Sequence, residues 1–167
     1  MKIVAKPKSK FLVSPLKKFA TVMAKELELD TSNLIIKIEP LLDAQKGAFE
    51  LPKKKTTAYL HMSINDDLGF PMICRALAHE LTHVAQYKQG RLVFGEEGVV
   101  FEGVVYPEAN LSPSVDGARL SEDEYLAYKA LPWEAEAYAN EDRLYDIAKE
   151  KLKNLKVKVA GEEFSLF

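Results

Sequence analysis

The sequence predicts a single α+β domain, and three observations lead to that class. The chain has 167 residues, of which 47% are hydrophobic and 29% are charged, so it is long and apolar enough for one compact core. Apolar residues recur at helical spacing in three long segments. Between the first two of these segments lie short stretches with the composition and alternation of β-strands. We therefore expect one domain over residues 1–167, with its core between about residues 14 and 155.

The first half is predicted to place a helix before a small mixed sheet. Ser14 and Pro15 are typical of an N-cap followed by a proline in the first turn, which opens a helix that runs to about Leu29. Residues 34–39 alternate apolar and polar as a strand does, and a second strand is expected around residues 47–51. Residues 57–64 are rich in β-formers and predict a third strand.

The second half is predicted to alternate helices with a hairpin. A long helical pattern covers residues 70–89 and is ended by Gly90, and residues 91–106 carry the glycines and alternating Val and Phe of a hairpin. After a loop over residues 107–117, Ser121 and Glu124 resemble a capping box, which opens a short helix to about residue 131. A strong helix is then expected from Trp133 to about Leu155.

Composition excludes several classes of partner and site. The net charge of −2 and a pI near 6.0 give no global reason for a nucleic-acid duplex or an anionic membrane to be the main partner. No apolar run approaches the roughly 20 residues that cross a bilayer, and the charged N-terminus lacks a secretory signal, so we expect a cytoplasmic protein without a membrane partner. The single cysteine, Cys74, leaves histidines and carboxylates as the ligands for any metal.

The segment His79-Glu80-Leu81-Thr82-His83 lies within the second long helix and has the spacing of a metal site. Residues four apart on a helix are rotated by about 40° and rise about 6 Å, so the two imidazoles meet at one point. Glu80 lies about 100° around from His79, where a carboxylate reaches a water on the metal without being a ligand. The motif predicts His79 and His83 as zinc ligands and Glu80 as a general base. Two histidines buried only for packing are the alternative interpretation.

A catalytic zinc ion takes three protein ligands and keeps one position open, so a third ligand is needed. The third histidine of the chain, His61, lies upstream, and a longer metalloprotease motif is excluded because Gln86 and Gln89 stand where it has Gly and His. Among the downstream acids, Glu134 and Glu136 follow a Pro-Trp pair that begins the last helix. They point about 160° apart, so one of them faces the metal. We favour Glu134 and keep Glu136 as the alternative.

With these residues, the chain resembles the gluzincins, the thermolysin-like metallopeptidases in which a glutamate from a following helix joins the two histidines. The resemblance covers roughly Tyr59 to Asn140, and it is closest to small bacterial and phage proteins that combine the motif with a Pro-Trp-Glu-x-Glu-Ala segment. In many gluzincins a small residue and then an aspartate lie three and four positions after the ligand. Glu134 has Ala137 and Tyr138 there, which leaves the orientation of a metal-bound histidine to Asn140, Glu141 or Asp142.

The resemblance implies a minimal zincin-like domain that binds one Zn²⁺ per chain through His79, His83 and Glu134. It implies hydrolysis of amide bonds in a protein or peptide substrate by a metal-activated water, with Glu80 as the base. The strand over residues 57–64 is expected to border the cleft and to pair with an extended substrate. Tyr106, Tyr125, Tyr128 and His61 are the candidates to stabilise the oxyanion, and packing at the edge of the core is the alternative interpretation of each.

Two other functions stay open at the level of sequence. The first is a non-catalytic metal-binding or interaction protein on the same fold, against which the carboxylate of Glu80 argues. The second is a nucleic-acid-associated protein, which is suggested only by lysines near the N-terminus (Lys2, Lys6, Lys8, Lys10) and by the run Lys53-Lys54-Lys55. The preferred function is therefore a zinc metallopeptidase, with nucleic acid not expected as a partner and the oligomeric state unknown.

Overall fold

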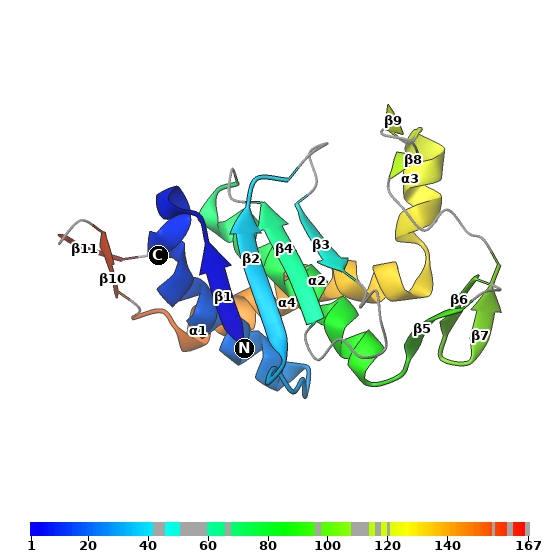
Figure 1. Ribbon diagram of the computed structural model, residues 1–167, viewed down its shortest axis with the longest axis horizontal. Coiled ribbons are helices and arrows are strands. Elements are labelled where there is room, and N and C mark those ends of the chain that lie inside the picture. The colour runs from blue at the N-terminus through cyan, green and yellow to red at the C-terminus, as the bar shows by residue number, and fades with distance from the viewer. Residues whose placement is uncertain are drawn as a thin grey trace.

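The computed structural model describes residues 1–41, 46–50, 60–65, 68–95, 98–107, 114–115, 118–119, 121–154, 156–159 and 162–165. Within these residues the chain forms four α-helices, one 3-10 helix and four small sheets, which is compatible with the predicted α+β class (Figure 1). The expected turn at residues 52–55, the first three residues of the strand expected at 57–64 and Asp66 and Asp67 before the motif helix lie outside the described residues.

The largest sheet has four strands in the order β1-β2-β4-β3. The first three strands are parallel, and β3 joins the edge antiparallel to β4. The strand predicted to border the cleft is β4, and it lies between two neighbours, so that prediction is wrong: β3 occupies the edge. The strands are β1 (Lys2–Ala5), β2 (Leu34–Glu39), β3 (Gly47–Glu50) and β4 (Leu60–Asn65).

One face of this sheet is covered by helices, and Figure 1 shows α1 (Val13–Glu26), α2 (Phe70–Lys88) and α4 (Pro132–Lys151) behind it. The period of two in β2 turns every second residue toward these helices, so that Leu34, Ile36 and Ile38 are each 1% exposed. The ring of Phe19 on α1 lies 5.5 Å from Phe70 and 6.4 Å from Tyr145, and thereby joins all three helices in one core.

The N-terminal segment departs from the sequence-based expectation. A 3-10 helix, η1 (Pro7–Leu12), runs directly into α1, so the helix begins at Val13, and its N-cap is Leu12 rather than Ser14. Residues before η1 form β1 because they add a parallel strand beside β2. Strand β1 has little local sequence signal, since it is only four residues long and depends on its neighbour.

Helices α2 and α4 form an antiparallel pair that carries the candidate site. Arg75 near the beginning of α2 donates to Asp142 at 2.6 Å, whereas Gln86 near its end donates to the carbonyl oxygen of Trp133 at 3.0 Å. Between these ends, Asn140 donates to the Thr82 hydroxyl at 3.3 Å. These contacts fix the register of the two helices, so residues 79–83 face the first turns of α4.

The chain between the two helices turns back through a three-stranded antiparallel sheet, where the sequence predicted a hairpin. Gly90 ends α2 with φ +70°, and Arg91 then donates its backbone N–H to the Gln86 carbonyl at 2.9 Å. The predicted capping box at Ser121 is confirmed, and the short helix it begins has no buried residue. These elements are β5 (Leu92–Gly95), β6 (Gly98–Phe101), β7 (Val104–Tyr106), β8 (Ser114–Val115), β9 (Ala118–Arg119) and α3 (Glu122–Lys129).

The C-terminal segment forms an antiparallel hairpin of β10 (Lys156–Val159) and β11 (Glu162–Ser165) where the sequence indicated only an apolar tail. Figure 1 shows this hairpin beside η1 at one end of the molecule, with α3 and the β5-β6-β7 sheet at the other. Among the described residues no helix has the length and apolar character of a membrane span.

Candidate metal centre

Helix α2 brings the two histidines of the motif together. It begins with Pro71 in its first turn and is interrupted by no further proline or glycine before Gly90, so the four-residue spacing of His79 and His83 is kept. Their Nε2 atoms lie 3.1 Å apart, and the side chains are 12% and 10% exposed. The geometry predicted from the sequence is present: two imidazoles converge near the surface of the helix.

Glu134 supplies a third converging side chain from the first turn of α4. Its Oε2 lies 3.3 Å from Nε2 of His79, and its Oε1 lies 3.4 Å from Nε2 of His83. One ligand atom from each of the three residues lies within 4.8 Å of the others. The side chain of Glu134 is 5% exposed, so the structure encloses a carboxylate at this point.

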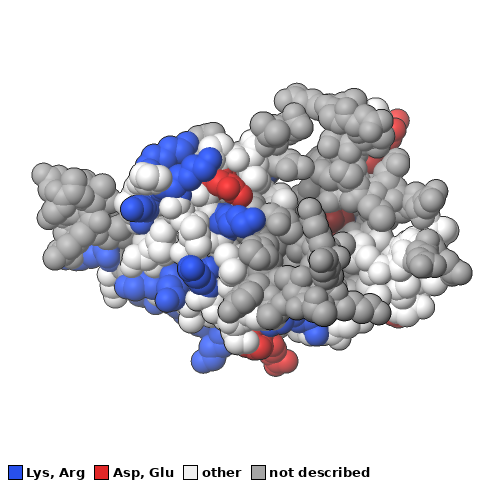
Figure 2. All heavy atoms as spheres, in the orientation of Figure 1, with Lys and Arg blue, Asp and Glu red and all other residues white. Residues whose placement is uncertain are grey.

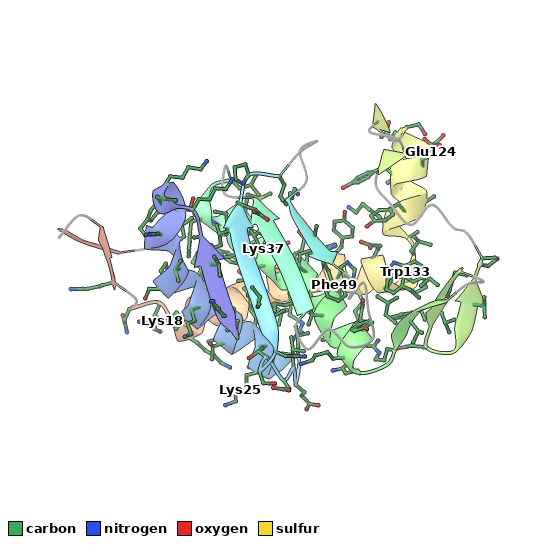
Figure 3. All side chains as sticks on the ribbon, viewed as in Figure 1. Lys18, Lys25, Lys37, Phe49, Glu124 and Trp133 are labelled. Atoms are coloured by element: carbon green, nitrogen blue, oxygen red, sulfur yellow. The ribbon has the colours of Figure 1, made fainter. Side chains whose placement is uncertain are left out.

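The position of Glu134 depends on the residues that begin α4. Pro132 stands in the first turn of the helix, and Trp133 is buried with its ring 5.2 Å from Tyr106 and 6.1 Å from Phe101. Figure 3 shows Trp133 at this point beside the β5-β6-β7 sheet. Because Trp133 is anchored there, the next residue is directed toward α2.

Glu136, the alternative third ligand, points elsewhere. Arg91 donates to both of its carboxylate oxygens, at 2.9 and 2.7 Å, and also to Glu102 at 2.6 Å. The guanidinium of Arg91 lowers the pKa of Glu136 against the raising effect of burial. This ion pair links α4 to the β5-β6-β7 sheet and leaves Glu134 as the carboxylate that faces the histidines.

Two contacts hold the histidines with their Nε2 lone pairs toward Glu134. Nδ1 of His79 lies 2.9 Å from the Glu141 carboxylate, which only accepts, so Nδ1 carries the proton. Nδ1 of His83 lies 3.0 Å from Oε1 of Gln86, whose amide nitrogen donates to the Trp133 carbonyl. The amide is thereby oriented, and Nδ1 of His83 donates as well. In the neutral histidines, both Nε2 atoms are therefore acceptors.

With both histidines neutral, three acceptors meet here without a donor between them, which makes this a site for positive charge, whether a proton or a cation. Oε2 of Glu134 is buried and has no hydrogen-bond partner of its own among the described residues, although buried carboxylate oxygens are nearly always satisfied. Burial works to raise the pKa of Glu134, yet contacts with His79 and His83 lower it to about 2. Burial likewise works to lower the pKa of His79, yet Glu134 and Glu141 raise it to about 9.

The donor set fits a divalent cation of the zinc type. Two imidazole nitrogens and one carboxylate are the ligands of many catalytic zinc sites. Tetrahedral bonds of 2.0–2.2 Å place neighbouring ligand atoms roughly 3.3–3.6 Å apart. The two Nε2 atoms lie 3.1 Å apart, and each lies 3.3 or 3.4 Å from a different oxygen of Glu134. The structure therefore brings together a group that could bind a metal ion.

Glu80 lies beside this group and is enclosed by the edge strand. The residue is 7% exposed, and burial raises the pKa of its carboxyl above the usual range, while His83 and His79 partly oppose that rise. A Cβ added at Gly47 on β3 would lie 2.7 Å from Cγ and 2.8 Å from Oε1 of Glu80. Only glycine fits at this point, so the backbone of β3 packs directly on the carboxylate.

Tyrosines from α3 and α4 form the other wall of the centre. The ring of Tyr138 meets His79 edge to face at 4.7 Å, and its hydroxyl lies 3.4 Å from the hydroxyl of Tyr125. Tyr128 is half-buried and close enough to Glu134 to contribute to the low pKa of that carboxyl. Of the four residues proposed to stabilise an oxyanion, Tyr128 approaches the centre, and Tyr106 packs on Trp133 instead. The side chain of His61 lies outside the described residues.

Sequence reasoning left three parts of the site undetermined. It offered Glu141 only as one of three replacements for the aspartate absent at Tyr138, and the structure places Glu141 on His79. Gln86 was considered only as a departure from a longer motif, although its position three residues after His83 on one helix face was a readable signal. Gly47 gave no signal, because nothing in the sequence relates β3 to Glu80.

Comparison of the chain with protein-family models, with curated proteins and with solved structures finds no match. The residues of the site are therefore what indicates a function for this chain.

Proposed function

We propose that this protein is a zinc-dependent metallopeptidase with a gluzincin-like site on a minimal zincin-like domain. The observation that carries the proposal is the convergence of His79, His83 and Glu134, whose ligand atoms lie within 4.8 Å of one another with a buried, unsatisfied carboxylate oxygen among them. His79, His83 and Glu134 would hold the ion, one per chain. Zn²⁺ at this position would supply a Lewis acid that lowers the pKa of water and polarises a substrate carbonyl.

Glu80 is the proposed general base. Its carboxylate takes the proton that the attacking water releases and returns it to the leaving amine, which completes amide hydrolysis without a covalent intermediate. Burial against Gly47 raises its pKa, and a base whose pKa is closer to neutral transfers protons more efficiently in both directions. Tyr128, on the side of Glu134, is the proposed donor to the oxyanion.

An extended peptide is the proposed substrate, bound along β3. This strand has its second edge free of other described strands, and it lies directly over Glu80. Backbone hydrogen bonds to such an edge hold a substrate in one register and direct its carbonyl groups toward the base. The predicted role of residues 57–64 in substrate pairing is thus transferred to β3.

A non-catalytic metal protein is the second candidate, and Glu80 distinguishes the two. A carboxylate enclosed beside two histidines has a large desolvation cost, and the metal ligands do not require it. In an enzyme the same carboxylate acts as the general base, which is a reason for it to be buried there. The buried position of Glu80 therefore favours catalysis over metal binding alone.

The test is the change Glu80→Gln in zinc-loaded protein, with cleavage of a peptide mixture followed by mass spectrometry. We expect cleavage to fall by about 10²- to 10⁴-fold while zinc content per chain is unchanged. Asp146→Asn, which alters an exposed acid on the same α4 helix that carries Glu134, should leave both quantities unchanged. Zinc binding without any cleavage by the wild type would instead support the non-catalytic candidate.

A further inference from the structure

The charges of this chain are separated along its sequence in a way that the net charge of −2 conceals. Residues 1–25 hold seven lysines and no acid, and residues 149–158 hold five lysines and one glutamate. These two segments therefore contain 12 of the 23 basic residues and one of the 25 acidic residues. They carry a net charge of +11, against −13 for the rest of the chain.

The fold brings the two basic segments to the same end of the molecule. Residues 1–25 form β1, η1 and most of α1, and α1 packs against α4, whose last turn begins the second segment. Strand β10 contacts η1, so the second basic segment also lies beside the first. Figure 2 shows Lys and Arg gathered over this end, and Figure 3 places Lys18 there. We call this surface the basic pole, and it lies away from α3 and the metal centre (Figure 1).

The lysines of the basic pole whose side chains are described are exposed. At its border Lys151 pairs with Glu26 at 2.5 Å and Lys153 pairs with Glu150 at 2.7 Å. In the described part of the chain, no ion pair involves the following exposed lysines: Lys2, Lys6, Lys10, Lys17 and Lys18. Uncompensated like charges on one surface repel each other, so their accumulation costs stability unless a polyanion binds them.

The residue types of the basic pole favour a lipid surface over a nucleic acid. All 12 cations are lysines, and the four arginines of the chain, which are the better residues for phosphate forks and base edges, lie elsewhere. Phe11 in η1 is 48% exposed next to Lys10, and Val4 on the neighbouring β1 is 44% exposed. An apolar ring between lysines inserts into the headgroup region of a bilayer, whereas a phosphodiester backbone offers it no apolar contact.

We propose that the basic pole docks this protein on an anionic lipid bilayer, with Phe11 inserted at the interface and the metal centre directed away from it. Lysines near such a surface each contribute to attraction, and one exposed aromatic ring adds the apolar contact that charge alone does not give. The inference is independent of catalysis, because it uses no residue of the metal centre.

The test is sedimentation of the whole protein with vesicles of phosphatidylcholine alone or with about one third phosphatidylserine. We expect binding to the anionic vesicles only, with loss of binding at high salt. Lys10→Glu should weaken it by about 5- to 25-fold, and Phe11→Ser by about fivefold. Lys46→Glu, which makes the same charge change at an exposed site outside the basic pole, should have little effect.

Each contrary result overturns the proposal. Equal binding to neutral vesicles, no binding to either kind, or equal effects of Lys10→Glu and Lys46→Glu would exclude docking by the basic pole. Binding to a DNA or RNA duplex without binding to anionic vesicles would assign the surface to nucleic acid instead. Thermal unfolding of each variant is measured in parallel, so that a loss of binding is compared only between folded proteins.

Discussion

Replacing Glu141 by glutamine changes the charge next to His79 and almost nothing else. Glu141 accepts from Nδ1 of His79 at 2.9 Å, and its side chain is 17% exposed. A glutamine of the same length keeps an acceptor oxygen, so the imidazole keeps its orientation and its tautomer. The variant Glu141→Gln therefore separates the negative charge from the geometry of this contact.

The expected loss follows from the strength of that contact. A hydrogen bond to a carboxylate is worth about 1.5–3 kcal/mol and one between neutral groups about 1 kcal/mol, so the difference is roughly 0.5–2 kcal/mol. The carboxylate also increases the basicity of Nε2, and loss of such partners typically weakens metal binding by about 10- to 100-fold. Because the site is only slightly exposed, we expect a zinc Kd about tenfold higher in Glu141→Gln.

Competitive titration with a chromophoric chelator measures this Kd without any need for activity. Asp142→Asn is the matched control, since Asp142 is the next acid on the same helix, 74% exposed and bound to Arg75. We expect its zinc Kd to match that of the wild type. Equal Kd values for wild type and Glu141→Gln, or equal weakening in Asp142→Asn, would refute the orienting role of Glu141.

Three further variants test other parts of the structure. In Gly47→Ala the new methyl group displaces Glu80, so cleavage should fall by about 100-fold with zinc content retained; an unchanged kcat/KM would contradict the close packing. Arg91→Met removes the pair with Glu136, which is partly exposed, so urea unfolding should show a loss of only about 1 kcal/mol. Leu144→Ala empties a fully buried position and should cost about 2–5 kcal/mol in the same assay, and a smaller loss would mean a looser core.

Elements with a strong local signal were predicted correctly. The motif helix was expected at residues 70–89 and spans Phe70–Lys88, and the strand expected at residues 34–39 is β2 (Leu34–Glu39). Alternation and helical periodicity are properties of the segment itself. By contrast, β1 exists because it pairs with β2, and the edge position of β3 follows from strand order, which no local pattern encodes.

In the candidate site, too, local geometry was predictable and long-range contacts were not. The spacing of His79, Glu80 and His83 determines their relation on one helix, and the opposite directions of Glu134 and Glu136 follow from helical geometry. The β5-β6-β7 sheet anchors Trp133 and Arg91, and these contacts decide which of the two glutamates faces α2. The contacts join residues far apart in the sequence, so no local pattern predicts them. The lysines near the N-terminus were noted from the sequence, but their grouping with those of residues 149–158 was not, because it depends on the fold.

The central claim is that His79, His83 and Glu134 together bind one zinc ion. The most direct measurement is zinc per chain, by plasma mass spectrometry after dialysis, for wild type, His79→Ala, Glu134→Ala and Glu136→Ala. We expect one zinc ion in wild type and in Glu136→Ala and almost none in the other two variants. Full zinc retention in His79→Ala would contradict the metal centre itself, and loss in Glu136→Ala but not in Glu134→Ala would contradict the assigned third ligand.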